Sequence, residues 1–141
     1  THKVWFIGSG CDNSPFSRRA NIQFVNPPYK EKRIFLLQAK CFVCLSFLEG
    51  GPIPLLEALS SGCIVASTPV GFASELRSLF NSSFYLFPFS RTNVADICLD
   101  LVQFLESSVD LRYSFSQQDV IRLTSTFGIP SLANKLLANL H

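Results

Sequence analysis

Short apolar runs alternate with segments of helical periodicity over most of the chain. The apolar runs predict buried strands at residues 3–7, 21–25, 42–45, 63–66 and 84–87. Between them, apolar residues recur at helical spacing, which predicts helices at residues 30–40, 54–61 and 73–80. Asn26-Pro27-Pro28 is predicted to be a loop, because its two prolines remove backbone donors. Strands that alternate with helices indicate βαβ units and a parallel sheet covered on both faces.

The pattern becomes helical in the last third of the chain. One face of a predicted helix carries Val94, Ile97, Leu101, Phe104 and Leu105. Two further helices are predicted from the apolar residues Val120, Ile121 and Leu123 and from Leu132, Leu136 and Leu137. We expect this helical C-terminal segment to pack across the sheet. The predicted fold class is therefore α/β, with a single Rossmann-like domain over residues 1–141.

Length and charge narrow the classes of function. A chain of 141 residues is long enough for one core and too short for two well-formed α/β domains. Its 48% apolar and 16% charged residues are typical of a folded protein. The net charge of +2 is too small and too scattered to indicate nucleic acid or an anionic membrane as a partner. No apolar run reaches the roughly 18 residues that a membrane span needs.

The cysteines and histidines suggest no metal and no catalytic triad. The five cysteines fit no disulfide framework. Cys41 and Cys44 lie in one predicted strand, where alternation points their sulfurs to opposite faces and disfavours shared metal ligation. We expect buried thiols in a reducing cytoplasm, so the predicted location is cytoplasmic. Ser46 has no triad partner, because both histidines lie at the chain ends.

A loop after the third predicted strand carries the candidate chemistry. Ligands of parallel sheets bind beyond the carboxyl ends of the strands, where residues 46–51 lie. Gly50 and Gly51 let a ligand approach the backbone, and the following helix start favours an anion. Glu49 and Glu57 are placed to accept hydrogen bonds from hydroxyls, as a sugar and a ribose offer. A nucleotide-sugar fits this arrangement, but a dipole-favoured glutamate and an ordinary Gly-Gly-Pro turn explain the same residues.

Several short motifs follow one another in a fixed order along the chain. They are Glu49-Gly50-Gly51-Pro52, Glu57-Ala58, Gly62, Ile64-Val65-Ala66-Ser67, Val70-Gly71 and Glu75. This order resembles the E-x7-E signature in the donor-binding half of group 1 (family 4) retaining glycosyltransferases. Those enzymes have two Rossmann-like domains that face a cleft. Weaker similarity extends to Lys3–Gly10, Phe24–Pro28 and Leu37–Lys40.

The resemblance implies a role for each residue of the signature. Glu49 is the expected catalytic residue and would contact the transferred sugar near its reacting carbon, as a nucleophile or as a positioning group. Glu57 would hold the ribose, and the loop around Pro28 would border the base. Backbone donors to the sugar and the diphosphate would come from Gly50, Gly51, Pro52, Ile53, Pro54 and Leu55. The resemblance implies no metal and no cofactor, because protein dipoles and basic side chains stabilise the departing diphosphate.

The implied function is transfer of a hexose with retention from a nucleotide-diphosphate sugar to a saccharide or lipid-linked acceptor. Such a reaction builds a polysaccharide or a glycoconjugate. The family's basic Arg/Lys pair would precede Thr1, so we expect that the first strand and helix and the acceptor-binding N-terminal domain are missing. We therefore expect the isolated chain to be inactive, and the missing domain to make any contact with the inner face of a membrane. Phe72 replaces a second glycine of the family pattern.

Three other interpretations remain open. A nucleotide-sugar epimerase shares the two-domain fold, but should have histidine and arginine around its site, and the signature here has neither nearby. A degenerate, non-catalytic domain would keep the fold and lose donor binding. An NAD-binding module is disfavoured, because Gly8-Ser9-Gly10 lacks the third glycine and an immediate helix.

Overall fold

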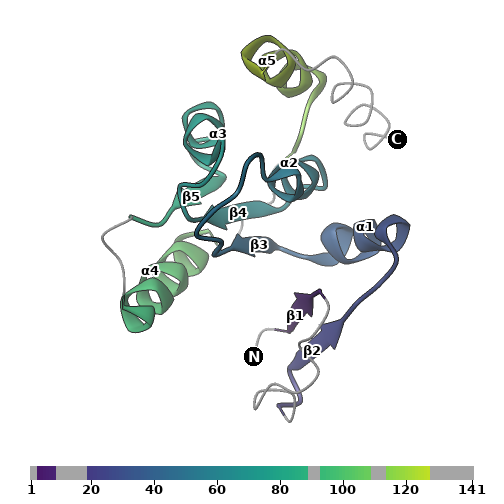
Figure 1. Cartoon of the computed structure of the whole chain (residues 1–141), viewed down its shortest axis with the longest axis vertical. Coiled ribbons are helices and arrows are strands. Elements are labelled where there is room, and N and C mark those ends of the chain that lie inside the picture. Colours follow the sequence, from purple (N-terminus) through teal and green to yellow (C-terminus); the bar gives the residue numbers. More distant parts are fainter. Residues whose placement is uncertain (1–2, 9–18, 89–92, 109–113, 128–141) are drawn as a thin grey trace. The chain divides into compact units, whose positions relative to one another are not determined.

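The computed structural model describes residues 3–8, 19–88, 93–108 and 114–127, drawn in colour in Figure 1. The elements are β1 (Val4–Ile7), β2 (Ile22–Val25), α1 (Tyr29–Gln38), β3 (Cys41–Cys44), α2 (Ile53–Ser60), β4 (Ile64–Ser67), α3 (Ala73–Leu79), β5 (Phe84–Leu86), α4 (Val94–Ser107) and α5 (Gln117–Phe127). The chain divides into two compact units, residues 1–35 and 36–141. Each unit is described by itself.

The first unit contains a pair of parallel strands and the start of α1. Strand β1 pairs with β2 in parallel, with Val4 opposite Ile22 and Ile7 opposite Val25. The rings of Phe6 and Phe24 stack with centroids 5.0 Å apart. Trp5 contacts the ring edge of Phe35 on α1 at 5.7 Å. Because neighbouring strand residues point to opposite faces, these two aromatic pairs lie on opposite faces of the two-stranded sheet.

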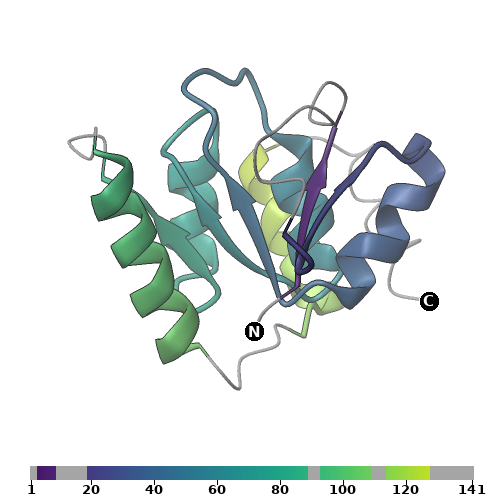
Figure 2. The same ribbon diagram turned by 90° about the horizontal axis from the view of Figure 1, so that it is seen from below.

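The second unit contains a three-stranded parallel sheet in the order β3-β4-β5. Helix α2 connects β3 to β4, and α3 connects β4 to β5, so the sheet is built from two βαβ units. The central strand β4 is buried at every position, which explains its continuous run of apolar and small residues. Figure 2 shows these strands between the surrounding helices.

Helices cover both faces of this sheet. Phe84 on β5 is 1% exposed and belongs to the main core, whereas the next residue, Tyr85, stacks on Phe104 of α4 at 5.3 Å. Figure 1 shows α4 on one side of the strands and α2, α3 and α5 on the other. The buried core cluster consists of Leu36, Leu55, Leu56, Ala58, Leu59, Cys63, Val65, Ala73, Leu76, Phe80, Phe84, Phe115, Val120 and Leu123. The main core therefore lies on the face that α2 and α3 share.

The predicted α/β class with parallel strands and alternating helices is confirmed, and each strand and helix predicted with bounds lies within two residues of them. The strands form two sheets, where the sequence predicted one. On α4 the predicted apolar face is half-buried except for Val94, which is exposed. The helix predicted from Leu132, Leu136 and Leu137 lies outside the described residues, and the single-domain expectation stays a prediction. No helix in the described ranges has the length and apolarity needed to cross a membrane.

The cysteines of the second unit differ in accessibility. Cys63 is buried, and its thiol donates to the carbonyls of Leu36 and Ala39 at 3.2 and 3.4 Å. Burial, reinforced by the neighbouring Cys63, raises the pKa of Cys41 from 9.0 to about 12. Cys98 is exposed on α4. Cys41 and Cys63 are therefore expected to react more slowly than Cys98 at mildly alkaline pH, because the thiolate is the reactive form and must be accessible.

Among the cysteines of the second unit, we expect iodoacetamide at pH 8 to modify Cys98 first and to leave Cys41 and Cys63 unmodified in the folded chain. Peptide mass spectrometry before and after unfolding in urea measures this order. The raised pKa of Cys41 also predicts a free energy of unfolding that falls as pH rises from 9 towards 12, because the folded state keeps its proton longer. Modification of Cys41 before Cys98 at pH 8 would contradict its raised pKa.

Candidate functional site

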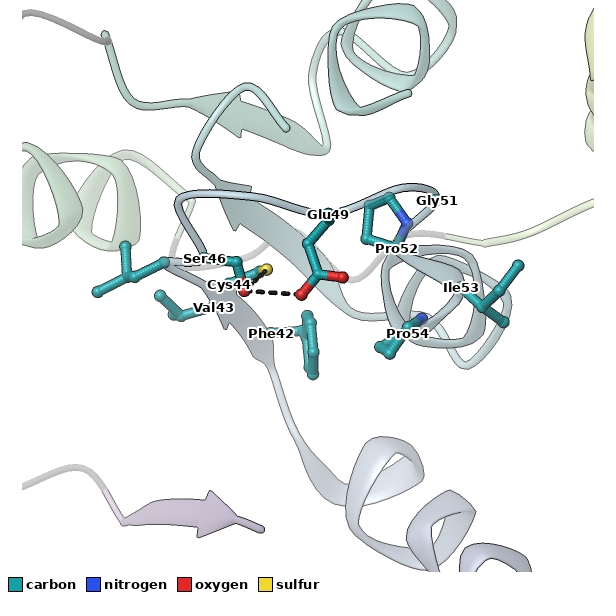
Figure 3. A pocket seen from close by; sticks show the side chains of 10 residues that line it. Phe42, Val43, Cys44, Ser46, Glu49, Gly51, Pro52, Ile53 and Pro54 are labelled. Carbon is teal, nitrogen blue, oxygen red and sulfur yellow. Dashed lines mark hydrogen bonds between the residues drawn. The ribbon is translucent and has the colours of Figure 1, made fainter. Parts of the chain in front are cut away.

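A pocket of about 480 Å³ opens at the carboxyl end of β3, beside the start of α2. Its size is within the roughly 300–1,000 Å³ typical of small-molecule sites. Figure 3 shows the side chains around it, with the carboxylate of Glu49 directed toward Ser46. The ten lining residues are Phe42, Val43, Cys44, Leu45, Ser46, Glu49, Gly51, Pro52, Ile53 and Pro54.

The turn before α2 leaves few backbone donors for a ligand. Pro52 and Pro54 have no N–H group. The Ile53 N–H donates to the carbonyl of Gly51 at 2.8 Å, and the Leu55 N–H donates to that of Pro52 at 3.0 Å. Within the described part of the chain, the N–H groups of Gly50 and Gly51 donate to no other residue. The backbone donors that remain at this helix start are therefore concentrated at the two glycines.

A hydrogen-bonded chain links Glu49 to the ends of two strands. The Ser46 hydroxyl donates to Glu49 Oε1 at 2.9 Å, and the Cys44 thiol donates to Ser46 Oγ at 3.7 Å. The Thr68 hydroxyl, just after β4, donates to the Ser46 carbonyl. The Thr68 N–H donates to the Cys44 carbonyl at 3.0 Å. Ser46 is thus held through both its backbone and its side chain.

The turn at Gly71 packs directly against the loop that carries Glu49. Gly71 has φ +52°, which side chains disfavour. A Cβ on Gly71 would lie 2.6 Å from Pro52 Cδ and 3.3 Å from the Glu49 carbonyl oxygen. A Cβ on Gly51 would lie 3.0 Å from Phe72 Cε1. The two loops therefore fit together because two glycines lack side chains, and Phe72 fills the space beside Gly51.

The predicted site residues fall into three groups. Glu49, Gly51, Pro52, Ile53 and Pro54 line the pocket, and Gly50 is exposed in the same loop. Leu55 is fully buried, and its N–H is already bonded within the turn. Glu57 is half-buried one turn after Ile53 on the same helix face, outside the lining. Pro28 lies in the first unit and is exposed. The roles predicted for all these residues stay predictions.

Sequence reasoning placed Ser46 in the candidate loop but did not predict its hydrogen bond to Glu49. Cys44 was considered as a metal ligand and as a buried thiol, and here it lines the pocket. The contact through Thr68 had no signal in the sequence, because Thr68 and Ser46 meet only when β3 and β4 pair.

The electrostatics of the pocket favour a neutral, hydroxyl-bearing ligand group. Among the ten described lining residues, Glu49 alone carries a charge. The carboxylate accepts hydrogen bonds from hydroxyls, while the apolar walls suit the carbon face of a small ring. In the described part of the chain, no group of three or more His, Cys, Asp or Glu is placed to hold a metal ion.

Comparison with known proteins decides the family. The model of the family described as "Glycosyl transferases group 1" matches residues 18–118. This chain belongs to that family. The group 1 glycosyltransferase resemblance of the E-x7-E signature is thereby confirmed. The match includes the pocket, the Gly71 turn and the strands of the second unit.

One curated relative gives a second, shorter match. The chain is 35% identical over 74 residues to a Bacillus subtilis (strain 168) protein that is named as a putative teichuronic acid biosynthesis glycosyltransferase. The alignment covers 52% of this chain and 19% of the relative. No solved structure was found to match the chain.

Proposed function

We propose that this group 1 glycosyltransferase binds a nucleotide-diphosphate sugar and, together with a further domain, transfers the glycosyl group to an acceptor with retention. The observation that carries the proposal is the position of Glu49. Its carboxylate lies at the carboxyl end of β3, is held by Ser46, and adjoins the two glycines with available N–H groups. This combination pairs an acceptor for sugar hydroxyls with donors for an oxygen-rich group.

The chemistry that these residues supply is binding and orientation. The Glu49 carboxylate accepts from a hydroxyl of the transferred sugar and places its reacting carbon at the mouth of the pocket. The N–H groups of Gly50 and Gly51 donate to the sugar or to the neighbouring phosphate oxygens. Because the ten lining residues include no cation, the positive charges that stabilise the departing diphosphate come from outside this set. Glu57, one turn into α2, accepts from the ribose hydroxyls.

The acceptor is proposed at the level of class. The B. subtilis relative is named for teichuronic acid biosynthesis, and this supports a saccharide or lipid-linked acceptor and a role in building a polysaccharide or glycoconjugate. We place the reaction in the cytoplasm, without a metal or a cofactor, and with the nucleotide-sugar as substrate. The epimerase interpretation receives no support from the lining, which lacks histidine and arginine.

Nucleotide binding should raise the melting temperature of this chain, and Glu57→Ala should abolish the shift. UDP, GDP and ADP are tested with UDP-glucose, GDP-mannose and ADP-glucose, using thermal unfolding by circular dichroism. A ligand at about 100 times its dissociation constant stabilises the folded state by roughly 2.7 kcal/mol.

Glu106→Ala is the matched control, since Glu106 is an exposed glutamate on α4, outside the pocket lining. It should keep the full shift. A chain that no nucleotide stabilises would refute donor binding and favour a non-catalytic domain. An equal shift in Glu57→Ala would instead remove the ribose role from Glu57 and leave donor binding intact.

A further inference from the structure

We infer that Ser46 is a positioning residue for the donor sugar, because its hydroxyl fixes the orientation of the Glu49 carboxylate. The inference rests on the proposed function, in which Glu49 contacts the transferred sugar. It assigns to Ser46 a role in discriminating a nucleotide-sugar from the bare nucleoside diphosphate.

The loop around Glu49 offers little else to hold its side chain. The two residues before it, Phe47 and Leu48, are each 91% exposed and provide no anchoring contact. Within the described residues, the bond from Ser46 is the side-chain hydrogen bond that Glu49 makes, at 2.9 Å. An unrestrained glutamate must lose its rotamer freedom when a ligand binds, and that loss weakens binding. The hydrogen bond from Ser46 restricts the rotamers of Glu49 before the ligand binds.

Ser46 is suited to this task because it is itself fixed. Its backbone carbonyl is bonded by Thr68, and its hydroxyl oxygen accepts from the Cys44 thiol at 3.7 Å. The same hydroxyl donates to Glu49 Oε1, along the dashed line in Figure 3. The second carboxylate oxygen then remains available to a sugar hydroxyl. Such support behind a ligand-contacting group is what keeps a binding site in productive geometry.

A purely structural serine and a positioning serine have different consequences for binding. Loss of a structural contact weakens the loop and reduces binding of every ligand alike. Loss of the positioning contact weakens binding only of the ligand that contacts Glu49, and that ligand is the sugar ester. The ratio of the dissociation constants of a nucleoside diphosphate and its sugar ester therefore separates the two roles.

We expect Ser46→Ala to weaken binding of the sugar ester by roughly three- to tenfold, the range of the typical net contribution of one hydrogen bond. Binding of the matched diphosphate should be unchanged. Isothermal titration calorimetry on the 141-residue chain measures both, with UDP and UDP-glucose, GDP and GDP-mannose, or ADP and ADP-glucose as the probe pairs. Ser46→Thr keeps the hydroxyl, so it should keep the wild-type ratio between the dissociation constants of the diphosphate and its sugar ester.

A double-mutant cycle with Glu49→Ala completes the test. If Ser46 acts through Glu49, Ser46→Ala has no further effect on sugar-ester affinity in the Glu49→Ala background. Equal weakening of both ligands, or additive losses in the double variant, would overturn the positioning role. A wild-type chain that binds none of the six probes is a different result, since it refutes the proposed function itself. Unfolding curves of each variant establish that the comparison is made between folded proteins.

Discussion

Gly71→Ala is expected to lower the free energy of unfolding by about 2–4 kcal/mol and to displace the loop that carries Glu49. Two costs combine. Alanine is strained at φ +52°, and its Cβ would be 2.6 Å from Pro52 Cδ, well inside contact distance. Pro52 is buried at the start of α2, so it cannot move aside without moving the helix start. The displaced loop should also bind nucleotide-sugars less well.

Gly50→Ala provides the matched control, because no atom lies within 4 Å of its added Cβ and its φ is not positive. Urea unfolding of the two variants measures the difference in stability, with the same slope expected for both. Gly71→Ala with a midpoint equal to that of Gly50→Ala would show that the turn and the loop are not packed as described.

Phe84→Ala is expected to cost about 3–5 kcal/mol of stability, since it removes a large buried ring and leaves a cavity. Phe84 is 1% exposed in the middle of the core cluster, between the sheet and its helices. Phe47→Ala is the same substitution at a site that is 91% exposed, and it should change stability by no more than about 0.5 kcal/mol. Chemical unfolding followed by circular dichroism measures both values.

If Phe84→Ala does not accumulate as folded protein, Phe84→Leu gives the graded comparison. A smaller cavity predicts an intermediate midpoint. Equal stability of the Phe84 and Phe47 variants would contradict the placement of β5 in the core. The difference between two phenylalanines also shows that composition alone does not reveal which of the fourteen are structural.

The local elements were predictable because burial has a local signature. The run Cys63-Ile64-Val65-Ala66 predicted a strand, and the structure shows β4 buried along its whole length. Pro52 and Pro54 likewise predicted a helix start, which the structure places at Ile53. In each case the pattern of a few neighbouring residues determines the backbone conformation, so a single sequence contains the information.

The parts that the sequence did not predict depend on contacts between distant segments. Thr68 reaches Ser46 only because β3 and β4 pair in one particular register. Phe72 was a departure from a family pattern, and its contact with Gly51 appears only when two loops are brought together. The loss of free donors at Ile53 follows from a turn whose detailed geometry two prolines and a glycine set jointly. None of these contacts produces a periodic pattern in the sequence from which it could be predicted.

The close fit between Gly71 and Pro52 has an evolutionary consequence. The two motifs are separate in the chain, yet a side chain at position 71 would collide with the ring of Pro52. The same position is also strained for a residue with a side chain, because its φ is +52°. A change at Pro52 alone therefore does not make position 71 open to larger residues. The turn after β4 thus limits which substitutions a descendant sequence can accept beside the loop that carries Glu49.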